Sequence, residues 1–306
     1  MAIQKEIWLR DILEGFFPDD SFAAKSVNDD AYVNAGKTVH VPNAGAPSTV
    51  TKNRTTVPAS ASKRTDNDVN YNLDEYTTAP VLIPNADTVE LSYDKRQSVI
   101  SQDKAQIRKA AHEGLLAAWA PAAAQCVVTT GSGAAAHQAS ATGNRKAVTL
   151  ADVRGLMTKF DQDDIPQEGR YLLLDATMYA ELLAAMTETQ QIGFFAAADV
   201  KKGIVGEAYG FKVMKRSDVL RYAVSTSEGT TTITGLATTA AATDCAAGLA
   251  WHESCVRRAV GEVKMFAKED DPTYYGDLYS FLVRCGGKIG RYDKKGVYAL
   301  VGITAS

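Results

Sequence analysis

The chain has 306 residues, of which 45% are hydrophobic and 23% are charged, and its formal net charge is −3. A chain of this composition folds into a globular protein with one large domain or two modest ones, and no overall basic charge points to nucleic-acid recognition. No apolar run reaches the roughly 18 residues that a membrane helix needs.

The first 36 residues predict a docking arm. Residues 3–17 place charged and apolar side chains at helical spacing, and this amphipathic pattern includes Ile7, Leu9, Ile12 and Phe16. Charged residues interrupt the apolar stretch that an export signal needs, so we expect a protein made and used in the cytoplasm. Residues 18–36 are polar and rich in turn signals. We expect this arm to pack on another part, or another copy, of the protein.

Residues 37–88 predict an extended hairpin. Residues 37–42 alternate at period two, and a second alternating segment contains Val69, Tyr71 and Leu73. The polar residues 43–68 join the two strands and carry the basic side chains Lys52, Arg54, Lys63 and Arg64. Such a hairpin buries too little apolar area to be stable alone. It is either a flexible excursion or a loop that lies on a neighbouring subunit, and we favour the neighbour.

One long helix follows the hairpin, over residues 98–119. Ile107, Ala111, Leu115 and Trp119 recur every four residues, so they share one face of the helix. Pro121 ends the helix. We expect this face to pack on strands near residues 263–266 and 278–283.

The remainder of the chain mixes helices and strands. Thr149 and Asp152 have the spacing of a capping box at the start of a helix. Residues 171–174 predict a short buried strand, and 178–186 predict a helix. Residues 190–204 read as a loop and 207–217 as a single glycine-punctuated strand. The apolar runs 256–266, 278–285 and 297–303 predict strands of one antiparallel sheet that returns to the long helix.

No motif for catalysis, cofactor binding or metal binding stands out. The glycines at 131 and 133 lack the lysine and hydroxyl residue of a phosphate-binding loop. The cysteines form no CxxC pair, which favours free thiols over a zinc site. The histidines share no ligand spacing, and we expect His112 to be a surface residue. We therefore predict no catalytic residue, no cofactor and no metal.

Charged clusters have a simple interpretation. The acidic groups at 161–164 and 269–271 match no calcium-binding loop and are typical of charged loop ends. The basic pairs are sparse, and we interpret them as partners in salt bridges between subunits. These pairs are Lys63-Arg64, Lys201-Lys202 and Arg257-Arg258.

The order of these parts resembles that of the major capsid proteins of tailed bacteriophages, which have the Hong Kong ninety-seven fold. Two local segments strengthen the resemblance. Residues 171–182 (YLLLDATMYAEL) are similar to the family's strand followed directly by a helix. Phe194-Phe195 followed by residues 203–217 (GIVGEAYGFKVMKRS) resembles its glycine-containing strand.

The resemblance implies an α+β fold with five parts. These are an N-terminal arm (1–36), an extended loop (37–88), a peripheral domain with a spine helix (89–123), a mainly axial domain (124–250) and closing strands of the peripheral domain (251–306).

The function implied by the resemblance is structural. The chain would assemble into hexamers and pentamers of an icosahedral shell around double-stranded DNA, in a virion capsid built in the host cytoplasm. Its partners would be other copies of itself, a portal, a scaffolding protein and, by non-specific contact, the DNA, with no membrane involved. With about 36 residues before the loop, any scaffold would be a separate protein.

Contacts between subunits are expected in the arm and the extended loop, at Ile7, Leu9, Ile12, Phe16, Lys52, Arg54, Lys63, Arg64, Val69, Tyr71 and Leu73. Two other functions stay open. One is the shell of an encapsulin-type cellular nanocompartment, and the other is an α/β enzyme without a recognisable motif.

Overall fold

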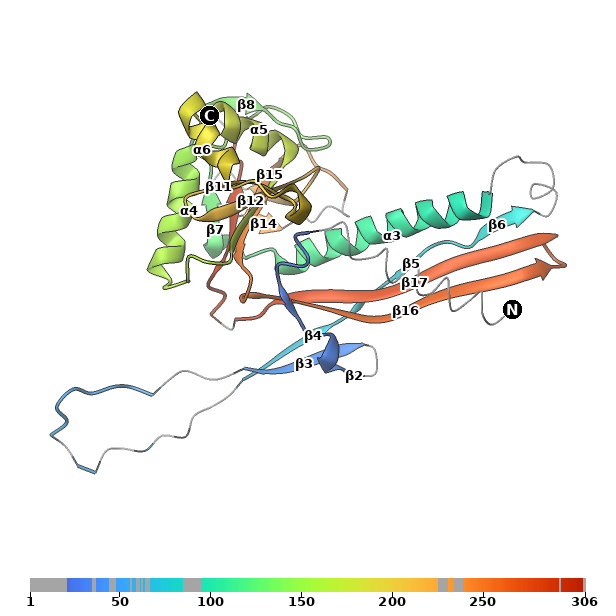
Figure 1. Ribbon diagram of the computed structural model, residues 1–306, viewed down its shortest axis with the longest axis horizontal. Coiled ribbons are helices and arrows are strands. Elements are labelled where there is room, and N and C mark those ends of the chain that lie inside the picture. The colour runs from blue at the N-terminus through green and yellow to red at the C-terminus, as the bar shows by residue number, and fades with distance from the viewer. Residues whose placement is uncertain are drawn as a thin grey trace.

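A computed structural model describes residues 21–34, 37–43, 48–55, 57–58, 61, 63, 67–84, 95–224, 231–233, 239–291 and 293–304. They form a head built around a large sheet, and an elongated part in which one helix lies along a long hairpin (Figure 1). The predicted α+β class is confirmed.

The elongated part has a helix on one face of a five-stranded sheet. Helix α3 (Lys95–Trp119) lies along the antiparallel strands β16 (Val256–Asp271) and β17 (Gly276–Ile289) (Figure 1). Strand β1 (Val27–Asn28) pairs in parallel with the start of β16, while β5 (Asp74–Thr77) and β6 (Val81–Pro84) pair with β17.

The predicted contact between helix and closing strands is confirmed for part of the helix face. Ile107 and Ala111 pack with Phe281, Val283 and Cys285 in one buried cluster, and the half-buried Val263 and Met265 pack against it. Leu115 and Trp119, one and two turns further along, belong instead to the core of the head. Helix α3 is therefore shared between two cores.

The head is organised around strand β15 (Asp244–His252), every residue of which is buried. It pairs with β10 (Arg170–Asp175), β13 (Leu220–Val224) and β18 (Val297–Val301). The eight-stranded sheet is completed by β7 (Cys126–Val128), β11 (Ile204–Ala208), β12 (Phe211–Arg216) and β14 (Thr231–Ile233). The other elements of the head are η2 (Ala123–Gln125), β8 (Gly133–Ala135), β9 (Asn144–Lys146), α4 (Leu150–Gln162), α5 (Ala176–Ala184), α6 (Glu188–Ala196) and η3 (Val200–Lys202).

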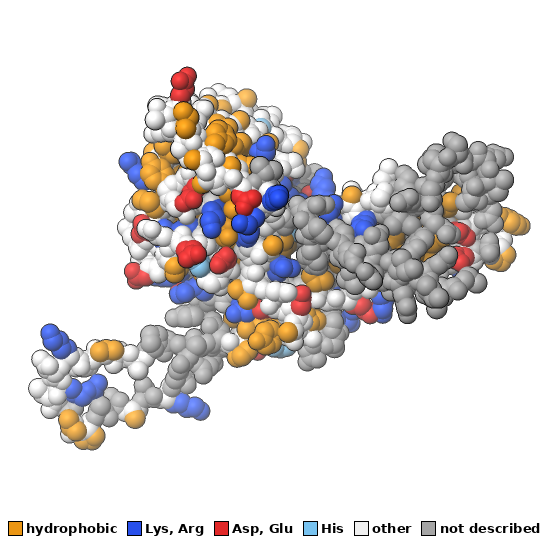
Figure 2. Space-filling view, viewed as in Figure 1, with side chains coloured by type: hydrophobic (Ala, Val, Ile, Leu, Met, Phe, Trp, Pro, Cys, Tyr) orange, Lys and Arg blue, Asp and Glu red, His pale blue; other side chains and the backbone are white. Residues whose placement is uncertain are grey.

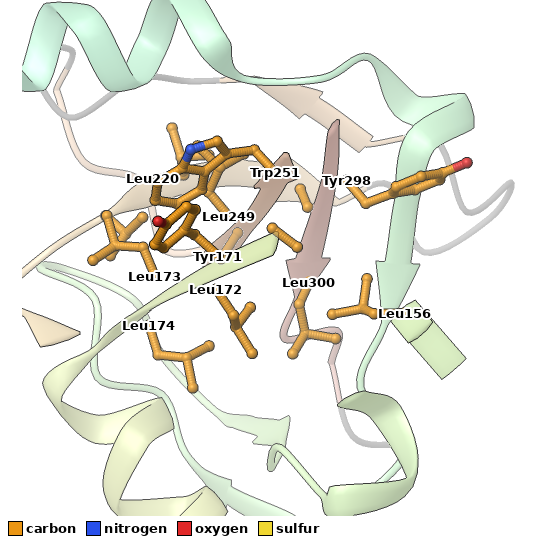
Figure 3. Packing of buried hydrophobic residues seen from close by; sticks show 14 of the residues in the cluster. Leu156, Tyr171, Leu172, Leu173, Leu174, Leu220, Leu249, Trp251, Tyr298 and Leu300 are labelled. Carbon is orange, nitrogen blue, oxygen red and sulfur yellow. The ribbon is translucent and has the colours of Figure 1, made fainter. Parts of the chain in front are cut away.

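Aromatic and leucine side chains fill the head. Tyr171 stacks on Trp251 with ring centroids 5.7 Å apart, and Trp251 in turn lies 6.0 Å from Trp119 of the long helix. Figure 3 shows Leu172 and Leu300 projecting from the sheet beside Leu156 of α4. Because Trp119 ends α3, the long helix is anchored directly in the core of the head.

The capping box at the start of α4 is confirmed, since Thr149 and Asp152 exchange both of its hydrogen bonds. Three other predictions in the head are wrong. Residues 190–204 contain a helix, α6, and residues 207–217 form two strands. Strand β18 joins the head sheet rather than the β16–β17 sheet.

His112 is buried instead of lying on the surface, at 2% exposure. Its ring packs edge-on against Phe22. Because Phe22 lies 90 residues earlier in the chain, this burial depends on a contact that helical periodicity does not reveal.

The base of the extended hairpin is a small sheet mounted on β16. Its strands are β2 (Val33–Asn34), β3 (Thr38–Asn43) and β4 (Asn67–Asn72), with η1 (Asp30–Tyr32) beside them. Val39, Val41, Tyr71 and Leu73 are buried against Ala259 of β16. The loop beyond these strands projects away from the rest of the molecule (Figure 1).

Candidate assembly surfaces

The extended loop is the most exposed part of the described chain. Val50 and Val57 are 97% and 81% exposed, and every described side chain between residues 48 and 63 is exposed. Residues 44–65 contain four basic residues and no acidic one. Basic side chains accordingly mark the projecting loop at the lower left of Figure 2. A projecting, basic loop with exposed valines has the composition of a contact surface.

The turn between β16 and β17 lies at the other end of the molecule (Figure 1). Tyr274 and Tyr275 are exposed there, as is Phe266 on β16. The sequence around this turn is acidic, with Glu269, Asp270, Asp271 and Asp277. Of these, Asp271 is paired with Lys268 at 2.8 Å. The two ends of the molecule thus differ in charge.

The structure divides the predicted contact residues into three groups. Lys52, Arg54 and Lys63 are exposed on the projecting loop. Val69, Tyr71 and Leu73 are buried within the chain at the base of the hairpin. A contact of Val69, Tyr71 and Leu73 with another subunit stays a prediction. Within one chain, these side chains are already covered by their neighbours. The remaining predicted residues lie outside the described ones: Ile7, Leu9, Ile12, Phe16 and Arg64.

Residues 21–34, which we call the strap, pack on their own chain. Phe22 is buried beside Trp119, and the carbonyl oxygen of Lys25 accepts a hydrogen bond from Trp251 Nε1 at 2.8 Å. Further along, Asp29 is fully buried and accepts hydrogen bonds from Arg257 Nη1 (2.7 Å) and from the Tyr71 hydroxyl (3.0 Å). The strap therefore joins the head, strand β16 and the base of the hairpin.

Two of the basic pairs make ion pairs within the chain. Arg257 binds Asp29, and Lys202 Nζ lies 3.0 Å from Asp199. Both side chains were expected to bridge subunits. Arg257 has a buried carboxylate partner within its own chain, and a salt bridge between subunits stays a prediction for these pairs. The acidic residue Asp163 lies near the end of α4, where it binds the Tyr298 hydroxyl and Lys295.

A group of polar side chains in the head combines a histidine with two carboxylates. His137 Nε2 lies 2.7 Å from Asp175 Oδ2, and this hydrogen bond raises the pKa of His137. The other oxygen of Asp175 caps helix α5 by accepting from the backbone N–H of Met178. Nearby, Glu181 accepts from the backbone N–H of Val148 at 2.9 Å, and burial raises the pKa of its carboxyl group.

A cavity of about 10 Å³ lies beside this group, which is room for about one water molecule. None of the residues that line it is a serine, threonine or cysteine. The hydrogen bonds of His137 and Glu181 connect the segment that carries β8 and β9 to helix α5. We therefore assign these polar groups a structural role.

The four cysteines lie largely inside the fold. Cys245, Cys255 and Cys285 are buried, Cys126 is half-buried, and none of the four forms a disulfide. Burial raises the pKa of Cys285 to about 12, so this thiol stays protonated at neutral pH. In the described part of the chain, no three His, Cys, Asp or Glu side chains gather in a group that would hold a metal ion. Among the described helices, none has both the length and the apolar character that crossing a bilayer demands.

Sequence reasoning missed the strap as a structural element. Its segment is largely polar, and its apolar residues Phe22, Ala23 and Val33 show no periodic spacing that would predict their core contacts. Nothing in the sequence marks Asp29 as buried, because its partners lie 42 and 228 residues away.

Comparison with known proteins gives structural relatives only. No family model matches the chain, and no curated protein matches its sequence. The capsid of cyanophage P-SCSP1u is similar over 92% of this chain and 87% of its own, with 19% identity and a TM-score of 0.62. The capsid of Ralstonia phage GP4 is similar over 92% and 88%, with 12% identity and a TM-score of 0.62.

A virus-like particle from Pyrococcus furiosus is similar over 97% of this chain and 99% of its own, with 10% identity and a TM-score of 0.55. These likenesses extend over nearly the whole chain. The chain therefore has the fold of bacteriophage capsid proteins, the Hong Kong ninety-seven fold that its sequence resembles.

Proposed function

We propose that this chain is the major capsid protein of a tailed bacteriophage, a structural subunit that assembles into the hexamers and pentamers of an icosahedral shell around double-stranded DNA. The observation that carries the proposal is the projecting loop at residues 48–63. Its described side chains are all exposed, in a chain whose fold is that of capsid proteins. A second copy of the chain is the natural cover for such a loop.

The charges of the two ends support a contact between copies. The loop carries Lys52, Arg54 and Lys63, whereas the β16–β17 turn is acidic and carries two exposed tyrosines. Opposite charges at opposite ends of an elongated subunit favour head-to-tail contacts, and such heterologous contacts close into rings when the rotation between copies allows it. Rings of five and six copies are the capsomers of an icosahedral shell.

The loop and the predicted arm would act as clamps between neighbours. An extended segment that lies on a neighbour buries area that it leaves uncovered in the isolated chain, and obligate interfaces of this kind exceed roughly 2,000 Å². A subunit held in this way has no need of an active site, and we propose that the chain is not an enzyme. The polar groups around His137 fit this reading, because they hold structural elements together.

The direct test is to image the purified protein and to measure its mass in solution. We expect ring-shaped capsomers or closed particles in negative-stain electron micrographs. A clean monomer at every protein concentration and salt concentration tested would contradict the proposal.

The partners follow from the role in a virion. We propose contacts with a portal protein and a scaffolding protein, non-specific contact with packaged DNA, and assembly in the cytoplasm of the host. Particles isolated from the natural source should contain nuclease-protected double-stranded DNA and a minor portal component. Particles that contain neither DNA nor a portal component would contradict the proposed role in a virion.

A nanocompartment shell is the second candidate, because the structural similarity to the virus-like particle from Pyrococcus furiosus extends over 97% of this chain. In that case the natural particles would enclose a protein cargo instead of DNA. Mass spectrometry and nucleic-acid extraction of the same particle preparation distinguish the two contents.

A further inference from the structure

We infer that Asp29 is a positioning residue, which holds the base of the extended hairpin against strand β16 and so links the loop to the head through the strap. The hydrogen bonds of Asp29 with Arg257 and Tyr71 lie within one chain and do not depend on shell formation. Its consequence for assembly rests on the proposed function.

The first end of the strap is fixed in the head. Phe22 is 2% exposed and lies edge-on to both Trp119 and His112, with ring centroids 6.0 and 5.5 Å apart. Trp251 Nε1 donates to the carbonyl oxygen of Lys25. Because these contacts involve fully buried aromatic side chains, this end of the strap moves with the head core.

The second end of the strap is fixed on β16. The backbone N–H of Asp29 donates to the carbonyl oxygen of Arg258 at 2.8 Å, and Arg257 Nη1 donates to Asp29 Oδ1. Asp30 adds a further bond, since its Oδ1 accepts from the backbone N–H of Val260 at 2.7 Å. The backbone N–H and one carboxylate oxygen of Asp29 are therefore both bound to β16.

That second oxygen, Oδ2, binds the hairpin. It accepts a hydrogen bond at 3.0 Å from the hydroxyl group of Tyr71 on β4, the strand by which the chain returns from the loop. Both side chains are buried, and burial together with the charge of Asp29 raises the pKa of the Tyr71 hydroxyl. The hydroxyl therefore stays a donor at any ordinary pH. The carboxylate of Asp29 thus accepts a hydrogen bond from β16 on one oxygen and from the base of the hairpin on the other.

The hairpin is also attached through the backbone, because β4 leads through Leu73 into β5, which pairs with β17. Its remaining side-chain attachments are less directional. Val39, Val41 and Leu73 pack against Ala259, and apolar contacts of this kind tolerate sliding and tilting. Lys288 Nζ donates to the carbonyl oxygen of Asn70, but this bond is exposed to solvent. The buried bond between Asp29 and Tyr71 is thus the directional side-chain contact that joins the loop base to the strap and to β16.

Tyr71→Phe is the sharpest test, because it removes only the hydroxyl and keeps the ring in its apolar cluster. Its matched control is Tyr298→Phe, which removes the hydroxyl that binds Asp163 in the head, far from the hairpin in sequence and in sheet. Hydrogen exchange followed by mass spectrometry reports on both regions at once. Asp29→Asn and the double variant with Tyr71→Phe complete a double-mutant cycle.

We expect Tyr71→Phe to speed amide exchange at residues 38–43 and 67–72 about ten-fold, the effect of losing one charge-assisted bond. Exchange in β10 and β15 should stay unchanged. Tyr298→Phe should leave exchange at the loop base as it is in the wild type. Adding Tyr71→Phe to Asp29→Asn should give a smaller further acceleration than Tyr71→Phe gives in the wild type, since the bond is already weakened.

Equal exchange at the loop base in the Tyr71→Phe and Tyr298→Phe variants would overturn the inference, as would fully additive effects in the cycle. If Asp29→Asn fails to fold, the comparison of the two tyrosine variants decides alone. Where the wild type forms shells, Tyr71→Phe should lower the yield of regular particles, and Tyr298→Phe should not. A wild type that forms no shells would refute the proposed function while the exchange result still stands.

Discussion

The indole N–H of Trp119 donates to the carbonyl oxygen of Arg257 at 2.9 Å. The donor is the last residue of α3 and the acceptor is the second residue of β16. The same arginine binds Asp29 of the strap through its side chain. Helix, long strand and strap therefore meet at a single residue.

Replacing Trp119 by Phe tests how much this junction contributes to the free energy of unfolding. The variant leaves the Arg257 carbonyl group without its donor and opens space between the two cores, so we expect the free energy of unfolding to fall by about 2–3 kcal/mol. Denaturant unfolding followed by circular dichroism measures the change. Ile192→Ala on the exposed face of α6 is the control and should change stability by less than about 0.5 kcal/mol.

Gly287 on β17 should not accept a side chain. A Cβ atom there would lie 2.7 Å from the Arg257 carbonyl oxygen and 2.8 Å from Trp119 Nε1. We expect Gly287→Ala to destabilise the protein by about 2 kcal/mol or more, because the strand or the helix must shift.

Gly155 in α4 is the matched contrast, since nothing lies within 4 Å of the Cβ position. Gly155→Ala should stabilise the protein by about 0.5–1 kcal/mol through helix propensity. The two thermal unfolding midpoints should move in opposite directions, and equal shifts would show that the close approach at Gly287 is unimportant.

The stability of the head should depend on pH through His137. Its hydrogen bond to Asp175 raises its pKa in the folded state, so the folded chain holds this proton more tightly than the unfolded chain does. The stabilisation is fully present below the pKa of an unfolded histidine, about 6.5, and is lost as the pH rises through the folded value. Unfolding curves between acidic and mildly alkaline pH should show this loss, and His137→Gln should flatten it.

Removal of the projecting loop should separate folding from assembly. Deleting residues 45–65 and joining the strands with Asn-Gly keeps β3 and β4 and supplies a two-residue turn. We expect a soluble protein with an unchanged thermal unfolding midpoint that forms no shells. Normal particles in electron micrographs of this variant would refute the role of the loop as a clamp.

Charge reversal in the loop probes the same contact more gently. Lys52→Glu combined with Arg54→Glu should weaken assembly, and added salt should reduce the difference from the wild type, because exposed charges are screened. Lys159→Glu on the exposed side of α4 is the control. An equal loss of assembly in the control would point to net charge rather than to the loop. Light scattering during assembly gives the comparison.

Local signals in the sequence were sufficient for much of the fold. The four-residue spacing of Ile107 and Ala111 predicted the packing of the long helix, and the Thr149–Asp152 pair predicted the start of α4. Both depend on residues that are close together in the chain. The same holds for the alternating segments that became β3 and β4.

Other features depend on partners far away in the sequence. Residues 207–217 form a hairpin because Tyr209 adopts a left-handed φ of 49° ahead of Gly210 at 77°, and a non-glycine residue gives little warning of this. The apolar run of β18 is compatible with either sheet, and only the partners β15 and β7 decide between them. The loop was predicted as a contact surface from its own residues. The hydrogen bonds of Asp29 could not be predicted, because its partners lie far away in the sequence.

The position of β18 has a consequence for how the subunit is made. The strand lies between β15 and β7, and about 170 residues separate it in sequence from β7. At synthesis rates of roughly 5–20 residues per second, a nascent chain spends on the order of ten to thirty seconds with β7 translated and this gap in the sheet unfilled. The head of each subunit is thus completed only when translation has passed residue 301. A nascent chain that has not reached residue 301 therefore lacks the strand that joins β7 to the rest of the head sheet.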